Sequence, residues 1–463
     1  MNKIVNQVKK EFKDCNDLIY KEIKIGINIY YIFFLETVSS SDKVNDYVLN
    51  GISFNKNIKN INKYLPSPNF INIKKSDEIN YYLCNGFTII INNNDIYAIE
   101  TRAELDRGIT EPSTEPNLHG PKDGLVENIQ INLGLIKRRL KTSHLKNKVN
   151  VIGRETKTIT NLLYIDNIVN IELVNDILKR LKTIDIDGIL DSGMIKNILD
   201  NSKNPFPTIK ISERPDTICA ALLNGKIVIL VDGSPYALIM PSFLLDFLNP
   251  ASDEYIKPTN INFLKLLRLT CFIFSIFIPA WYIAITTYNQ ETIPLSLLLN
   301  FATQRSGVPF PAIVEAIIMI GVCEILKESD LRFPNNYGSA ISILGALILG
   351  EAAVEAGIVS PIMIIVVAIT FISSLLFSDS EIAGAIRVWR LIFLLLSTIF
   401  GLYGICLGII IFLINLTSYK SMYINYTFPI EPFDKDYLKK IVLGIKSNRR
   451  SKYLTKNTTR SNL

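Results

Sequence analysis

The stretch 338–370, GSAISILGALILGEAAVEAGIVSPIMIIVVAIT, decides the fold, because its 33 residues include only two charged side chains, Glu351 and Glu355. The same composition extends to both sides. Residues 269–418 contain 14 charged residues, against 92 in the whole chain of 463 residues. A helix needs about 20 mainly apolar residues to cross the hydrocarbon core of a bilayer. The sequence therefore predicts a helical membrane domain in the last third and a soluble part before it.

About five transmembrane helices are predicted within 261–418. Two of them are uncharged runs of 22 and 24 residues, Leu269–Gln290 and Leu391–Ile414. A short apolar segment bounded by prolines, 293–305, is expected to be a further re-entrant or interfacial element, which is stable only where protein or water covers its backbone. The other three predicted spans are Pro309–Leu326, Phe333–Gly350 and Ala356–Ser378.

The basic residues predict the orientation of the chain. Lys257, Lys265 and Arg268 precede the first span, which places the soluble part on the cytoplasmic side. Five crossings would leave the basic tail at 446–460 on the opposite side, against the same rule. An even number of crossings would remove the conflict, and the sequence does not decide between them.

Charge and composition limit the function classes. Residues 269–418 have a net charge of −4 within a total of +6, so the rest of the chain carries +10, which suits an anionic cytoplasmic leaflet. No nucleic-acid-binding motif is present, so we expect no nucleic acid partner. The six cysteines form no CxxC pair and there are only two histidines, so we expect no disulfide framework, metal site or cofactor. Phosphate-binding, zinc-protease and serine-hydrolase motifs are absent from the sequence, which argues against an enzyme.

The soluble part contains an internal repeat. LCNGFTIIINNNDIYAIE (83–100) matches LLNGKIVILVDGSPYALI (222–239), with the Asn-Gly and Tyr-Ala pairs in register, and both predict β-hairpins. IFFLE (32–36) and LLYID (162–166) match upstream, each predicting a strand that leads into a helix. We therefore predict an α+β cytoplasmic domain of two related α/β lobes. The predicted divisions are a first lobe at 1–101, a linker and basic helix at 102–154, a second lobe at 155–260, the transmembrane domain at 261–418 and a basic C-terminal tail at 419–463.

The predicted helix in the linker has two distinct faces. Its apolar stripe consists of Ile129, Leu133, Ile136 and Leu140. Its other face is basic and either contacts an anionic lipid, a phosphate or an acidic partner, or is simply solvated. The basic residues are Lys137, Arg138, Arg139 and Lys141.

Carboxylates in apolar segments are the candidates for an ion pathway, because a charge at bilayer depth is costly unless it faces water or a partner. Glu351 and Glu355 are four residues apart on one helical face, among small residues that allow helices to approach closely. Copies of such a helix in a ring would present carboxylates to a central path. The alternative is that both lie hydrated at a helix end.

Two further glutamates, Glu315 and Glu324, are candidates for the same pathway. Glu324 alternatively pairs with Lys327, three residues away. Arg305 is expected either to pair with one of these acids or to anchor its segment at the headgroups.

Several long motifs, in one order from about Arg102 to the C-terminus, closely resemble the A subunit of GerA-type spore germination receptors. The matching blocks are EPSTEPNLHGPKDGLVEN (111–128), PFPTIKISERPD (205–216), LLNGKIVILVDGSPYALIMP (222–241), PAWYIAI (279–285), ETIPLSLL (291–298), GVPFPAIVEAIIM (307–319), the stretch 338–370 and GLYGICLGIIIFLINLTSYKS (401–421).

This resemblance implies a nutrient germinant receptor in the inner membrane of a bacterial endospore. It also implies B and C partner subunits and a homo-oligomer of A subunits that forms a nutrient-gated cation channel. Two positions depart from the family pattern: Ser306 stands where a glutamate precedes GVPFP, and Glu351 stands where an amide is more common. A non-conducting scaffold and a secondary transporter are the alternatives. The germinant, the ion and the subunit number do not follow from the sequence.

Overall fold

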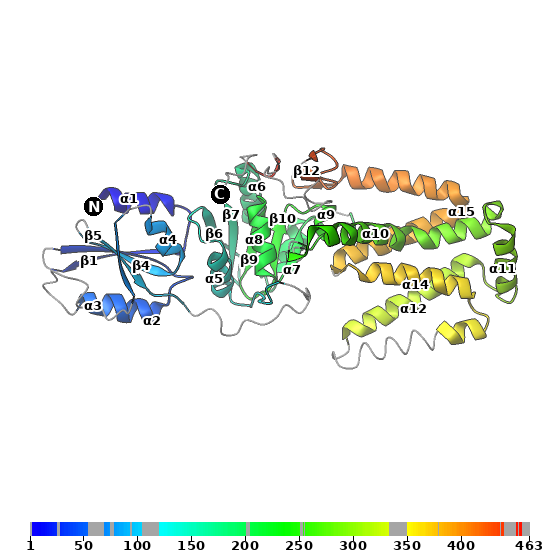
Figure 1. Cartoon of the computed structure of the whole chain (residues 1–463), viewed down its shortest axis with the longest axis horizontal. Coiled ribbons are helices and arrows are strands. Elements are labelled where there is room, and N and C mark those ends of the chain that lie inside the picture. Colours follow the sequence, from blue (N-terminus) through cyan, green and yellow to red (C-terminus); the bar gives the residue numbers. More distant parts are fainter. Residues whose placement is uncertain are drawn as a thin grey trace.

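The computed structural model contains two α/β lobes followed by a bundle of long helices (Figure 1). The first lobe is farthest from the bundle, and the second lobe lies between them. The structure describes residues 2–25, 28–53, 69–74, 78–92, 95–103, 120–200, 204–250, 253, 255–332, 350–377, 379–435, 437–438, 451 and 453–455.

The first lobe is built on an antiparallel five-stranded sheet with the order β1-β2-β4-β5-β3. Helices cover both faces of this sheet, and each face has its own cluster of buried apolar side chains. The strands are β1 Leu18–Ile25, β2 Asn28–Leu35, β3 Phe70–Ile73, β4 Phe87–Asn92 and β5 Asp95–Glu100. The helices are α1 Asn2–Glu11, α2 Ser41–Val44, the π-helix η1 Asn45–Leu49, α3 Asn50–Ser53 and α4 Glu78–Cys84.

The second lobe repeats this plan with the strand order β6-β7-β9-β10-β8. Helices α5 and α8 pack on one face of the sheet, and α6 and α7 pack on the other. The strands are β6 Leu145–Ile152, β7 Thr158–Ile165, β8 Lys210–Ser212, β9 Ile227–Val231 and β10 Ala237–Met240. The helices are α5 Ile129–Arg139, α6 Ile171–Lys182, α7 Ser192–Leu199, α8 Pro215–Leu223 and α9 Leu244–Leu248.

Strand for strand, the two sheets have the same order, as the sequence repeat predicts. Both predicted hairpins are present, as the pairs β4–β5 and β9–β10. The two predicted strands that lead into a helix are also present, as β2 followed by α2 and β7 followed by α6. The structural repeat also includes elements outside the matched sequence. Helix α1 precedes the first sheet in the same way that α5 precedes the second. Helix α5 and strand β6 lie within the predicted linker 102–154, so the second lobe begins earlier than predicted.

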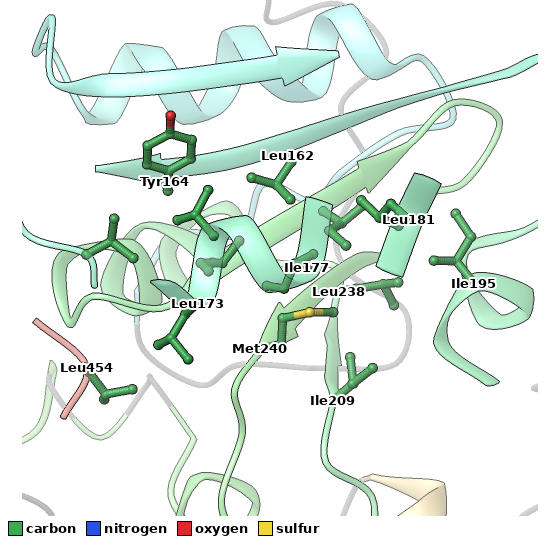
Figure 2. Close-up of a cluster of buried hydrophobic side chains, with 14 of the residues drawn as sticks. Leu162, Tyr164, Leu173, Ile177, Leu181, Ile195, Ile209, Leu238, Met240 and Leu454 are labelled. Carbon is green, nitrogen blue, oxygen red and sulfur yellow. The ribbon is translucent and has the colours of Figure 1, made fainter. Parts of the chain in front are cut away.

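The C-terminal tail is part of the second lobe's core. Ile424, Phe428 and Leu454 are buried in the cluster formed by α6 and one face of the second sheet, and Figure 2 shows Leu454 beside Leu173. Gly225, which has φ +85°, has no room for a Cβ, since that atom would lie 2.9 Å from the carbonyl oxygen of Leu454. The described part of the predicted tail 419–463 therefore completes a lobe that begins almost 300 residues earlier.

A buried ion pair joins the two lobes. The Lys137 ammonium on α5 contacts the Asp17 carboxylate of the first lobe, and Thr37 Oγ1 donates to the same carboxylate at 2.6 Å. Nearby, Lys146 Nζ donates to the backbone oxygen of Glu11 at 2.5 Å. Because Asp17 and Lys137 are both about 95% buried, separating the lobes would expose unpaired charges, which is costly.

The helical domain contains fewer simple spans than the sequence predicts. The predicted extra element at 293–305 is a short helix, α11, and the predicted span Phe333–Gly350 lies outside the described residues except for Gly350. The helices are α10 Pro258–Thr287, α11 Leu295–Arg305, α12 Ala312–Arg332, α14 Pro361–Leu375 and α15 Ser380–Ser418, and residues 350–355 form a further helical segment.

Helix α15 reverses direction at Gly401, which has the non-helical angles φ 60° and ψ −139°. The rings of Trp389 and Phe412 are 4.8 Å apart, whereas residues 23 positions apart in a straight helix are separated by about 34 Å. A Cβ at Gly401 would lie 2.8 Å from Cβ of Tyr288, so the turn requires glycine. The prediction of a single span at Leu391–Ile414 is therefore wrong, because this segment consists of two antiparallel arms.

The reversal also brings the end of α15 back to the lobes (Figure 1). Tyr288 and Gly401 lie at the far end of the bundle, whereas Tyr419 Oη donates to Asp200 Oδ1 of the second lobe at 2.9 Å. The lobes and the described part of the tail are thus on the same side of the bundle. For a bundle that spans a membrane, this arrangement corresponds to an even number of crossings, the alternative that satisfies the rule for basic residues.

A topology experiment tests this arrangement. Accessible tags fused before Met1 and after Leu463 are expected to be modified from the same side of the membrane, since the tail packs on the second lobe. A tag inserted at Glu291, in the turn after α10, is expected on the opposite side. Impermeant labelling of sealed vesicles measures both. Labelling of the two termini from opposite sides would contradict the structure.

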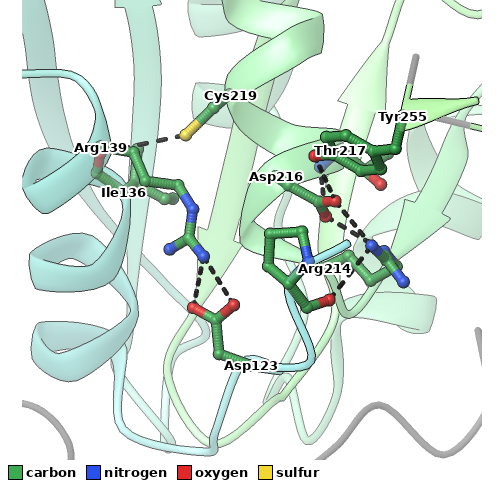
Figure 3. Close-up of polar contacts among 9 residues, drawn as sticks. Asp123, Ile136, Arg139, Arg214, Asp216, Thr217, Cys219 and Tyr255 are labelled. Atoms are coloured by element: carbon green, nitrogen blue, oxygen red, sulfur yellow. Dashed lines mark hydrogen bonds and ion pairs between the residues drawn. The ribbon is translucent and has the colours of Figure 1, made fainter. Parts of the chain in front are cut away.

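A polar network secures the start of α8 in the second lobe (Figure 3). Burial raises the pKa of Asp216, but hydrogen bonds from Arg214, from Tyr255 and from the Thr217 amide outweigh it, so its pKa lies below the ordinary value. Arg214 Nη2 is 2.6 Å and Tyr255 Oη 2.8 Å from Asp216 Oδ2. The carboxylate thus ties α8 to the segment that leads into α10.

Replacing Asp216 by Asn is expected to lower the free energy of unfolding by about 3 kcal/mol at neutral pH, because the buried Arg214 loses its ion pair with this carboxylate. The pKa in the folded state lies below the unfolded value of about 3.9, so this stabilisation is present above that value and is lost as the pH falls through the folded pKa. The melting temperatures of the full-length wild type and the Asp216→Asn variant are measured in detergent at neutral pH and near pH 3. The difference between the two proteins should become smaller at the lower pH. The control is the Asp187→Asn variant, which changes an exposed carboxylate. A stability difference between wild type and Asp216→Asn that does not depend on pH would refute the lowered pKa of Asp216.

Candidate functional site: buried charges in the helical domain

Two of the described helical stretches are long and apolar enough to cross a membrane by length and composition, Asn260–Thr287 and Ser380–Ser418, and the second of them is folded back on itself at Gly401. Many large apolar side chains on their outer faces are exposed, among them Phe274, Trp281 and Leu413. An apolar surface of this extent suits contact with lipid. The charged side chains inside this bundle are therefore the candidate functional site.

Glu315, in the first turn of α12, is fully buried. Its Oε2 accepts hydrogen bonds from the backbone N–H of Ser360 at 2.9 Å and from Ser360 Oγ at 2.8 Å. Ser360 is the N-cap of α14, so the carboxylate lies at the positive end of that helix, where a negative charge is stabilised. Arg305, at the end of α11, approaches Glu315 Oε1 at 3.4 Å. Of the two roles expected for Arg305, this contact corresponds to pairing with an acid, and anchoring at the headgroups stays the alternative.

Glu324 lies about two and a half turns further along α12 and forms a second cluster. Its Oε2 is 3.0 Å from Arg387 Nη2, and its Oε1 is 3.7 Å from Arg390 Nη1. Arg390 is 97% buried and donates through Nε to the Ser275 carbonyl oxygen of α10 at 2.9 Å. The cluster therefore connects α10, α12 and α15, and Glu324 pairs with these arginines rather than with Lys327.

The two clusters lie at different depths in the bundle. Glu315 is three residues from the start of α12, whereas Glu324 is about 18 Å along the helix axis from that start. The first cluster holds one acid and one base, and the second holds one acid and two bases. Neither presents an unpaired carboxylate in the described conformation.

Glu351 and Glu355 are arranged differently. Both are exposed on the helical segment 350–355, and neither forms an ion pair with a described residue of the Glu315 or Glu324 clusters. Gly357, just beyond them, lies against the loop that precedes α12, since a Cβ on it would be 3.0 Å from the carbonyl oxygen of Gly307. The segment is thus at the same end of the bundle as Glu315, with its two carboxylates at the surface.

The basic face of α5 is largely used within the chain. Lys137 pairs with Asp17, and Arg139 Nη2 is 2.6 Å from both oxygens of Asp123 (Figure 3). Arg138 also has a partner within the protein, and Lys141 is exposed. The predicted contact of this face with lipid or an acidic partner remains a prediction, and Lys141 is the residue available for it.

The sequence analysis missed Arg387, Arg390 and Ser360 as members of the site. The two arginines are three residues apart, a spacing that places both on one helical face, which was a usable signal. Ser360 directly precedes Pro361, a pair typical of a helix start, but its contact with Glu315 joins residues 45 positions apart and has no local signal.

Two α/β lobes attached to a helical bundle with buried ion pairs define a membrane protein with a large extramembranous domain. Comparison with known proteins gives the family. Residues 6–453 match the Bacillus/Clostridium GerA spore germination protein family, and the chain belongs to it.

Its relatives include spore germination protein KA of Bacillus subtilis (strain 168), which is 35% identical over 450 residues, covering 94% of this chain and 83% of that one. Spore germination protein GerLA of Bacillus cereus is 35% identical over 473 residues, covering 98% and 96% of the two chains. Among solved structures, the N-terminal domain of the A subunit of the Bacillus megaterium spore germinant receptor GerK3 is 27% identical with a TM-score of 0.40, covering 52% of this chain and 95% of that one.

The pairing of Glu324 can be tested by a double-mutant cycle with Arg390. Glu324→Met is expected to lower the free energy of unfolding by about 3 kcal/mol, because it leaves Arg390 buried without a counterion. The double variant Glu324→Met/Arg390→Met should recover most of this loss, since an apolar pair needs no charge compensation. Thermal unfolding in detergent measures both, with the exposed Glu291→Gln as control. Additive losses would show that the two side chains do not interact.

Proposed function

We propose that this chain is the A-type membrane subunit of a spore germinant receptor and that several copies form a nutrient-gated cation path. The proposal places the helical domain in the inner spore membrane and the lobes in the spore core, with B and C subunits as partners. Its main support is family membership over residues 6–453, together with relatives that are spore germination proteins.

The distribution of carboxylates supports a path formed between copies rather than through one chain. Glu315 and Glu324 are held by bases within the bundle, so they serve packing in this conformation. Glu351 and Glu355 are exposed at one end of the bundle. Carboxylates on neighbouring copies would form a ring that attracts cations, as in cation-selective pores.

In this mechanism the partner subunits bind the nutrient, and the A subunits respond by a change in conformation. A ligand shifts such an equilibrium only by its differential affinity for the two states. The second lobe is the element able to transmit the change, because it contacts both ends of the α15 hairpin. Lys196 pairs with Glu381 at the first end, and Asp200 binds Tyr419 just after the second.

A non-conducting scaffold is the second candidate, and one observation favours it. The buried Glu315 and the partly buried Glu324 are both compensated by arginines, as expected of charges that hold helices together. In that case the lobes would dock the other subunits, and another chain would conduct.

Ion flux in liposomes separates these functions. The purified chain, with and without B and C subunits, is reconstituted as wild type and as Glu351→Gln/Glu355→Gln. If the pair faces the path, the double variant should lower the cation-to-anion permeability ratio about tenfold, equivalent to roughly 1.4 kcal/mol. The measurement is the reversal potential in a salt gradient.

The control is Glu431→Gln, which removes an exposed carboxylate from the tail outside the bundle. Flux that depends on this chain, with selectivity altered only in the double variant, supports the channel. Unchanged selectivity would remove Glu351 and Glu355 from the path. An absence of flux in every assembled condition would overturn the channel and leave the scaffold.

A further inference from the structure

A cavity of about 290 Å³ lies where the chain leaves α15 and rejoins the second lobe. Its walls come from α6, the end of α7, the two residues just before β8, the end of β10 and the residues directly after Ser418. Figure 2 shows the part contributed by the lobe, where Ile177, Ile209 and Met240 lie close together. The cavity therefore exists only because the tail packs on the lobe.

The floor of the cavity is apolar and its polar wall is largely satisfied within the protein. Ile177, Ile209 and Met240 are buried members of the core cluster. Asp200 accepts hydrogen bonds from Tyr419 Oη and from the Thr208 amide, both at 2.9 Å. The single carboxylate that lines the cavity is thus already bound through both oxygens.

The remaining charges on the lining are positive. Lys420 is exposed, and its ammonium forms no ion pair with any residue that the structure describes. Arg180 lies 2.8 Å from Asp176 through Nε, and a guanidinium has five N–H donors, so it can bind a further acceptor. Arg180 and Lys420 can bind an anionic group, and the apolar floor can contact an apolar part of the same molecule. The cavity therefore suits a ligand that has both.

The position of the cavity indicates where such a ligand comes from. Tyr419 and Lys420 directly follow the last residue of α15, and phospholipid headgroups lie at the ends of a spanning helix. Tyrosine and basic residues are enriched at this level of a membrane. The volume is near the lower limit of small-molecule sites, about 300 Å³, so it suits a headgroup rather than a whole lipid.

We propose that this cavity binds the phosphate of an anionic glycerophospholipid, with Lys420 and Arg180 as its cationic contacts. A soluble phosphate ester offers the same chemistry, and the position beside the end of α15 favours the lipid. Bound there, the headgroup bridges the second lobe and the end of the α15 hairpin. The inference needs the arms of the α15 hairpin to lie in a membrane, but it does not need the chain to conduct ions.

Native mass spectrometry of the full-length protein in detergent, titrated with phosphatidylglycerol, tests the proposal. Lys420→Gln/Arg180→Gln is expected to bind the lipid about tenfold more weakly than wild type, since each basic residue contributes to binding of anionic lipid. The matched control is Lys179→Gln/Lys182→Gln, which removes two exposed charges from the same helix, α6, outside the cavity lining. Lys420→Gln alone keeps the test valid if the Arg180 change disturbs folding, because Lys420 is exposed.

Two competitors identify the source of the phosphate. Phosphatidylcholine has no net charge and is expected to displace little lipid, whereas soluble glycerol 3-phosphate carries the phosphate without acyl chains. Displacement by glycerol 3-phosphate at equal concentration would support the anion site but overturn the lipid as its ligand. Equal retention of phosphatidylglycerol by wild type, the single variant and the double variant would overturn the site. Equal loss in the control pair would show attraction by net charge alone and would overturn it as well.

Discussion

The reversal of α15 at Gly401 is the constraint on which the rest of the arrangement depends. The turn needs a positive φ and a residue without Cβ, because Tyr288 occupies the space that a side chain would fill. It returns residues 402–418 to the lobes and so allows the tail to bury Phe428 and Leu454 in the second lobe. The core of that lobe is therefore closed by residues that lie on both sides of the helical domain in the sequence.

The contacts at the junction explain how movement of one part can reach the other. The second lobe holds the first arm of α15 through Lys196 and Glu381 and the second arm through Asn204 and Asn415, whose side chains are 2.9 Å apart. Arg390 lies on the first arm, within reach of Glu324. A displacement of the lobe that tilts this arm would therefore act on a buried ion pair, where small changes in geometry have large electrostatic effects because the surroundings screen poorly.

Local chemistry made much of the two lobes predictable. Asn-Gly pairs at Gly86 and Gly225 directly precede the two hairpins, and both glycines have the positive φ that is typical of the residue just after a helix end. The linker boundary was missed because β6 and its helix share too little sequence with their counterparts in the first lobe. The basic face of α5 has the composition of a solvated or binding surface, but the partner of Lys137 is Asp17, 120 residues earlier, and only the folded chain brings them together.

In the bundle, too, local sequence predicts helices but not the contacts between distant residues. An uncharged run of 24 residues predicts one span, since length and hydropathy carry no information about a reversal inside it. The pairing of Arg305 with an acid was predictable, because a buried charge needs a counterion, but the choice of Glu315 depends on how α11 and α12 meet.

The pairing of charges also separates two kinds of acidic residue in the helical domain. Glu315 and Glu324 are enclosed and compensated, so their negative charges are already used to hold α10, α11, α12, α14 and α15 together. Glu351 and Glu355 lie at the surface of the described chain, at the end of the bundle that contains Gly307. An uncompensated carboxylate beside lipid is unfavourable, so this surface must face water or another protein. In the proposed assembly, the segment 350–355 is therefore the surface that a neighbouring copy or a partner subunit would contact.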